Sequence, residues 1–120
     1  MKITEIAFTG IPVTDMPRAR AFYEGTLGLE PTMESAGGMW IEYDIGAATL
    51  GIGCYGEMWQ PSAQGTCVAL EVDDVDASIA HLKAQGVTIA MEPMDSPVCR
   101  FGMITDPDGN KLIIHKRHAH

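Results

Sequence analysis

Basic residues are scarce in this 120-residue sequence. Eight Lys and Arg stand against 16 Asp and Glu, so the net charge at pH 7 is 8 − 16 = −8. Proteins that bind nucleic acid need clustered Lys and Arg to replace the counterions of the phosphates, and anionic membrane surfaces attract basic segments in the same way. The charge balance therefore argues against both kinds of partner.

A long apolar run and a secretory signal are also lacking. The longest nearly apolar stretch, residues 46–56, is well short of the roughly 18 residues that a membrane-spanning helix needs. The first eight residues mix polar and apolar side chains, with Glu5 early, whereas a signal peptide begins basic and continues through an unbroken apolar segment. We expect a cytoplasmic protein whose N-terminus forms a strand.

Cysteine is too sparse for a disulfide framework. The three cysteines are an odd number, and none forms a Cys-x-x-Cys pair. Cytoplasmic proteins generally keep their thiols reduced. We therefore expect Cys54, Cys67 and Cys99 to be free thiols.

The overall amino-acid composition is that of a globular protein. Apolar residues make up 46% of the chain and charged residues 20%, which is typical of a chain that folds around a core rather than remaining disordered. A chain of this length buries roughly two-thirds of the surface that it exposes when unfolded. We predict a single domain over residues 1–120.

Two amphipathic helices are predicted, each after a short strand. The first begins near Asp15, which can cap it, and ends at Gly28; the second begins near Asp74 and ends at Gly86. Apolar residues recur at helical spacing in both segments, and a glycine after the last turn is typical of a left-handed helix end. The remaining residues are predicted to form short strands, separated by turns rich in Gly, Asp and Asn.

The two halves of the chain repeat one order of predicted elements, strand–helix–strand–strand–strand. Asp15 and Asp74, at equivalent helix starts, are 74 − 15 = 59 positions apart, and other shared positions have nearly the same spacing. We interpret this pattern as an internal repeat. Module one spans residues 1–54, a connection spans 55–64 and module two spans 65–120.

Three segments resemble a known family. The segment 13–29, which begins Val-Thr-Asp-Met-Pro-Arg-Ala-Arg-Ala-Phe-Tyr, resembles the first helix of the vicinal oxygen chelate superfamily, which includes glyoxalase I, the bleomycin resistance proteins and the extradiol dioxygenases. The segment 72–87 resembles its second helix, and Asp-Pro-Asp-Gly-Asn-Lys-Leu (106–112) resembles the hairpin before its last strand. The resemblance implies an α+β fold of two βαβββ modules, whose curved mixed sheets form a cleft, and commonly a homodimer.

The metal enzymes of this superfamily carry His or Glu ligands on the first and last strands of each module. Counting back seven residues from Asp15 and Asp74 places the two first-strand positions at Phe8 and Cys67, and the last-strand positions fall at Gly51 and Ile113. Only Cys67 has a side chain that could bind a metal, as thiolate, whereas a catalytic divalent ion normally takes three or four protein ligands. The departure from the family pattern predicts a protein without a metal or other cofactor.

The same four positions form the predicted ligand-binding surface, together with Trp40 and Trp59. Strand alternation places Gly51 on the cleft face and leaves Leu50 and Ile52 for the core. Glycine in a strand often marks the close approach of a ligand, and sheet curvature explains it equally well. For the thiol and the aromatic rings, packing in the core is the alternative interpretation.

Three functions stay open for this sequence, and one of them is that of a small dimeric interaction or regulatory protein whose cleft is vestigial. Glycine and aromatic side chains around a cleft favour binding of a small apolar or aromatic molecule without chemistry, as the resemblance to bleomycin resistance proteins implies. The alternative is a lyase or isomerase of the glyoxalase type, with a Glu or His base or with relocated metal ligands. Its candidate catalytic residues are Glu71, Glu42 and His115, because proton abstraction beside a carbonyl needs a base whose pKa is raised toward neutrality in a dry pocket. A solvated strand-end carboxylate is the alternative role for both Glu residues.

Overall fold

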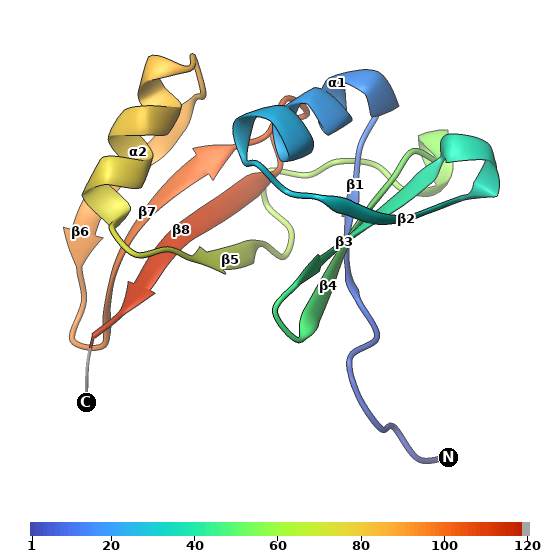
Figure 1. The fold of residues 1–120 in the computed structure, drawn as a ribbon, viewed down its shortest axis with the longest axis horizontal. Helices are drawn as coiled ribbons and strands as arrows, with labels where there is room; N and C mark the ends of the chain where they lie inside the picture. The colour runs from blue at the N-terminus through green and yellow to red at the C-terminus, as the bar shows by residue number, and fades with distance from the viewer. Residues whose placement is uncertain (119–120) are drawn as a thin grey trace. The chain divides into compact units, whose positions relative to one another are not determined.

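The structure is a computed structural model that describes residues 1–118. The chain divides into two compact units, Met1–Pro61 (unit 1) and Ser62–His120 (unit 2). Each unit contains a strand, a helix and three further strands in the predicted order (Figure 1). The predicted α+β fold of two βαβββ modules is therefore confirmed.

Unit 1 is a four-stranded mixed sheet with one helical segment. Its elements are β1 (Thr9–Pro12), α1 (Met16–Arg20) continued by a π-helical turn (Ala21–Thr26), β2 (Pro31–Ser35), β3 (Trp40–Ile45) and β4 (Ala48–Gly53). The strand order is β1-β4-β3-β2, with β1 parallel to β4 and the other pairs antiparallel. The core includes Ile41, Tyr43 and Ile52, which are fully buried, and Tyr43 packs on Tyr23 of the helical segment with ring centroids 6.3 Å apart.

Unit 2 repeats this arrangement. Its elements are β5 (Val68–Glu71), α2 (Val75–Ala84), β6 (Ile89–Asp95), β7 (Cys99–Thr105) and β8 (Lys111–Arg117), in the strand order β5-β8-β7-β6. In Figure 1, α2 (yellow) lies along the sheet of this unit, and it contacts β6, β7 and β8. Gly102 of β7 lets the helix approach closely, because a Cβ there would lie 3.2 Å from the Ile79 side chain.

The predicted helix boundaries are confirmed at both ends. The side chains of Asp15 and Asp74 each accept a hydrogen bond from the backbone N–H three residues later, at 3.1 and 3.0 Å. This satisfies one of the unpaired N–H groups of the first turn. Gly28 and Gly86 have φ values of 75° and 83°, the left-handed conformation that glycine adopts without strain.

The first helix differs from the regular helix that its spacing predicted. Its second half is a π-helical turn, in which the N–H of Leu27 donates to the carbonyl of Phe22 at 2.9 Å. Within this wider turn, Glu24 accepts from Nε of Arg20 at 2.6 Å and from the hydroxyl of Tyr43 at 2.9 Å. The turn therefore places the Glu24 carboxylate where its hydrogen bonds link the helical segment to Tyr43 of β3.

The strand predicted at the N-terminus is shorter than expected. Residues 1–8 have no regular secondary structure, and β1 begins at Thr9. The physical reason is the length of its partner: Thr9 is paired with Leu50, and β4 begins only two residues earlier, at Ala48. Most of the first eight residues therefore have no strand beside them in unit 1.

Glu24 gives the fold a pH-dependent contribution to stability. Burial raises the pKa of Glu24, but hydrogen bonds from Arg20 and Tyr43 outweigh burial and hold the pKa below its ordinary value. A carboxyl group of this kind stabilises the fold above its unfolded pKa, about 4.3, and the contribution is lost as the pH falls through the folded pKa. We expect Glu24→Gln to be less stable at pH 7 and to lose less further stability below about pH 4.5 than the wild type.

Urea unfolding midpoints at pH 7, 5 and 3.5 would measure this difference. The control is Glu30→Gln, which removes an exposed carboxylate of the same unit. An equal pH dependence in wild type and Glu24→Gln would show that Glu24 does not make this contribution.

Candidate functional site

The face of the unit 1 sheet that points away from the helix carries an aromatic cluster. Alternation along β3 directs Ile41 and Tyr43 into the core, so Trp40 and Glu42 point to the opposite face. The cluster is defined by six residues, which we call the aromatic face: Phe8, Trp40 and Trp59 over Gly10, Gly51 and Gly53.

The three glycines allow the indole rings to lie close to the backbone. A Cβ on Gly51 would lie 2.6 Å from Cη2 of Trp40, and one on Gly10 would lie 2.8 Å from Cη2 of Trp59. A Cβ on Gly53 would meet both rings, at 2.8 and 2.9 Å. These distances are shorter than van der Waals contact, so any side chain at these positions would displace an indole.

The rings of the aromatic face also contact one another. The indoles of Trp40 and Trp59 are stacked, with centroids 6.2 Å apart and an interplanar angle of 28°. Phe8 meets Trp40 edge to face at 4.9 Å. Phe8 is 47% exposed, and both indoles are half-buried, so part of the aromatic surface of the cluster is open to solvent.

The two indoles are held in different ways. Trp40 lies on β3, and its Nε1 donates to Oε2 of Glu42 at 2.8 Å. Trp59 lies on the segment that follows β4, where a 3-10 turn at Gly56–Met58 brings the chain back over the sheet. The left-handed φ of 61° at Gly56 is a conformation that favours glycine. Strand geometry positions Trp40, whereas a short turn positions Trp59.

A hydrogen-bonded pair of side chains lies on the sheet of unit 2. Glu71 of β5 and His115 of β8 are register partners, and Nδ1 of His115 is 2.6 Å from Oε1 of Glu71. The second carboxylate oxygen of Glu71 accepts from the backbone N–H of Arg117 at 2.8 Å. The bonds from Arg117 and His115 lower the pKa of Glu71, and its side chain is 46% exposed. A base with a raised pKa in a dry pocket was the hypothesis for Glu71, and this environment has the opposite effect.

The predicted ligand-binding residues fall in both units. Four of the six lie in the aromatic face of unit 1, and Cys67 and Ile113 lie in unit 2. Packing of Cys67 as a buried thiol is wrong in this structure, because Cys67 is exposed and precedes the first residue of β5. Core packing is also wrong for Phe8. The prediction of free thiols is confirmed for all three cysteines.

The two faces of β3 differ in burial. Tyr43 is completely buried in the core, whereas Trp40 is half-buried on the opposite face. A signal was available in the alternation of Ile41, Tyr43 and Ile45 with the three residues Trp40, Glu42 and Asp44. The first set is the more apolar, and two of its members, Ile41 and Tyr43, are buried in the core.

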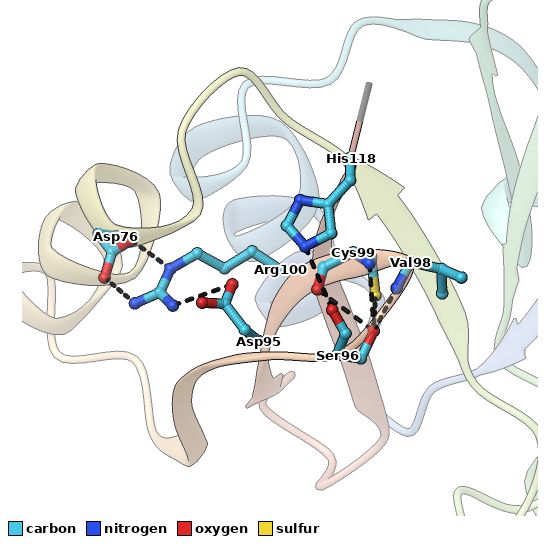
Figure 2. Close-up of polar contacts among 7 residues, drawn as sticks. All are labelled: Asp76, Asp95, Ser96, Val98, Cys99, Arg100 and His118. Carbon is cyan, nitrogen blue, oxygen red and sulfur yellow. Dashed lines mark hydrogen bonds and ion pairs between the residues drawn. The ribbon is translucent and has the colours of Figure 1, made fainter. Parts of the chain in front are cut away.

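A polar cluster closes the β6–β7 hairpin (Figure 2). Oγ of Ser96 accepts from the backbone N–H groups of Val98 and Cys99, at 3.3 and 3.1 Å, and lies 3.1 Å from the Cys99 thiol. Nε2 of His118 lies 3.2 Å from the Ser96 carbonyl. These groups form hydrogen bonds with one another, and Cys99 is buried. The cluster therefore stabilises the turn between β6 and β7.

Arg100 ties the same hairpin to α2 (Figure 2). Its guanidinium donates to both carboxylate oxygens of Asp76, at 2.6 and 2.8 Å, and lies 3.3 Å from a carboxylate oxygen of Asp95. These bonds raise the pKa of Arg100 and lower that of Asp76. Arg100 therefore links α2 to the sheet at the protein surface through charge-assisted hydrogen bonds.

The four positions predicted from the sequence to correspond to the family's metal ligands carry side chains that do not suit a metal centre. Phe8, Gly51 and Ile113 offer no side-chain ligand atom. Within residues 1–118, no three side chains of His, Cys, Asp or Glu are grouped so that they could hold a metal ion.

Among the helices in the described part of the chain, none is long and apolar enough to cross a membrane.

The sequence and the fold of this chain are similar to those of known proteins. Residues 5–114 match the family model described as the Glyoxalase/Bleomycin resistance protein/Dioxygenase superfamily. CFP32 of Mycobacterium bovis, named as a candidate glyoxylase, is 38% identical over 101 residues, which are 81% of this chain and 38% of CFP32. The chain therefore spans well under half the length of this relative.

The solved structures with this fold include two that match nearly the whole chain. TnmS3, an antibiotic-binding protein from Streptomyces sp. CB03234, has a TM-score of 0.80 at 28% identity, with 98% of this chain and 99% of TnmS3 covered. A member of the same superfamily from Sphaerobacter thermophilus has a TM-score of 0.78 at 24% identity, with 95% and 98% covered.

Proposed function

The chain belongs to the glyoxalase/bleomycin resistance protein/dioxygenase superfamily, and we propose that it binds a small apolar or aromatic molecule on its aromatic face, without a metal ion. The observation that carries the proposal is the stacked pair of Trp40 and Trp59 over three strand glycines, with Phe8 exposed at its edge. Aromatic rings stack on planar ligands and gain about 0.5–1.5 kcal/mol per ring pair beyond the area buried. Antibiotic binding by the similar TnmS3 supports a binding role.

We further propose that the chain acts as a homodimer in the cytoplasm. The single chain exposes the apolar side chains of Phe8, Met33 and Met39. All three lie in unit 1, and a symmetric partner would remove part of this surface from water.

Phe8→Leu is expected to weaken binding of a neutral planar aromatic probe, such as acridine at pH 8, by about threefold to tenfold, because it removes one ring from the aromatic face. Both tryptophans of the chain belong to this face. Quenching of intrinsic tryptophan fluorescence therefore reports binding at this face, and titration with the probe gives the dissociation constant.

The matched control is Phe101→Leu. Phe101 lies on β7 of unit 2, in register with His115, and is half-buried. We expect this variant to bind acridine as the wild type does. Equal losses in the two variants, or no loss in Phe8→Leu, would contradict the assignment of the ligand to unit 1.

The Glu71–His115 pair favours a second candidate function, a lyase or isomerase of the glyoxalase type. A carboxylate bonded to Nδ1 orients a histidine and leaves Nε2 as the proton acceptor. In this candidate His115 is the base and the anionic Glu71 is its positioning residue, and Glu42, which bonds Trp40, has no part in the proton transfer. Turnover of a carbonyl substrate that is lost in His115→Gln would favour this function over binding alone.

A further inference from the structure

Resting on the proposed function, we infer that the aromatic face selects a positively charged planar ligand over a neutral or anionic one of the same shape. The first observation is the distribution of charge along the chain. Between Arg20 and Lys83 the sequence contains no Lys or Arg. Strands β2, β3 and β4 and the segment that carries Trp59 all lie in this stretch.

The charged side chains beside the aromatic face are carboxylates. Glu42 is on β3, two residues after Trp40, and Asp44 follows it on the same face by alternation. Oε2 of Glu42 accepts the Trp40 indole N–H, and within residues 1–118 its Oε1 accepts no hydrogen bond. Asp44 accepts from the hydroxyl of Thr49 at 2.9 Å. Glu42 therefore places negative charge at the rim of the Trp40 ring.

The basic residues of unit 1 lie elsewhere. Arg18 and Arg20 belong to α1, on the other face of the sheet, and Lys2 lies in the segment before β1. Arg20 is bound to Glu24 at 2.6 Å and lies 3.7 Å from Glu34. No Lys or Arg on β1 to β4 offsets the charge of Glu42.

An indole beside a carboxylate is complementary to a cation. The face of the indole carries the negative part of the ring quadrupole and attracts a cation, and the carboxylate attracts it as well. A neutral ring of the same shape gains only the stacking, and an anion is repelled. The order of affinity should be cation, then neutral ring, then anion.

Three tricyclic probes of similar size test this order: N-methylacridinium, acridine at pH 8 and anthracene-9-carboxylate. We expect the cation to bind about fivefold more tightly than acridine at 50 mM salt. The ratio should shrink as salt screens the exposed carboxylate. In Glu42→Gln the ratio should fall to within about twofold, because the amide oxygen can still accept the Trp40 N–H while the charge is removed.

The control is Asp73→Asn, which removes one exposed negative charge in unit 2. It should leave the ratio unchanged, and an equal loss in Asp73→Asn and Glu42→Gln would show that bulk charge decides the preference and would overturn the inference. Acridine binding as tightly as the cation would also overturn it, while the proposed function would stand. Failure of all three probes to bind would refute the proposed function itself.

Discussion

Gly51→Leu is expected to weaken binding of a planar aromatic probe by tenfold or more, a loss of at least about 1.4 kcal/mol. A Cβ at this position would lie 2.6 Å from Cη2 of Trp40, and a leucine adds three further carbons. The indole must then leave its place on the sheet and give up its hydrogen bond to Glu42. Calorimetric titration measures this loss without depending on the fluorescence of the displaced tryptophan.

Gly25→Leu is the matched control for this variant. Gly25 is exposed, and a Cβ there would meet no atom within 4 Å, so we expect unchanged affinity. We also expect Gly51→Leu to lower the melting temperature by only a few degrees, because the half-buried Trp40 can rotate toward solvent. Wild-type affinity in folded Gly51→Leu would show that the aromatic face is not the binding site.

Leu50→Ala is expected to lower the free energy of unfolding by about 2–5 kcal/mol. Leu50 is the residue before Gly51 on β4, but its side chain points into the core and is 3% exposed. Truncation leaves a cavity that the neighbouring core side chains fill only in part. Urea unfolding followed by circular dichroism gives this value, and the affinity for the aromatic probe should stay within about twofold of the wild type.

Leu50→Ala and Gly51→Leu together test how β4 faces. One substitution should reduce stability and spare binding, while its neighbour should reduce binding and largely spare stability. Two variants that both unfold, or that both lose the probe while folded, would contradict the opposite facing of these adjacent residues.

The helix boundaries could be predicted because their causes are local. Asp15 and Asp74 bond to backbone groups three residues away, and Gly28 and Gly86 adopt a conformation that depends on the absence of their own Cβ. The spacing of these residues also revealed the repeat. Short-range chemistry of this kind is present in the sequence whatever the rest of the chain does.

The interiors of the elements were less predictable because they depend on neighbours. The π-helical turn at Ala21–Thr26 contains Glu24, whose partner Tyr43 is 19 residues away. Likewise, β1 has no partner before Ala7, because the first residue of β4, Ala48, lies two residues before Leu50, the partner of Thr9. Hydrophobic spacing along one segment carries no information about the length or side chains of the segment beside it.

For the candidate site, the sequence by itself determined the fold and the residue types at four of its positions. Only the tertiary structure decided that Trp40 and Trp59 occupy the space over Gly10, Gly51 and Gly53. These contacts join β3 and the segment after β4 to backbone positions on β1 and β4. Such contacts depend on strand register and on a turn that folds back over the sheet, and neither is encoded in the period of a single segment.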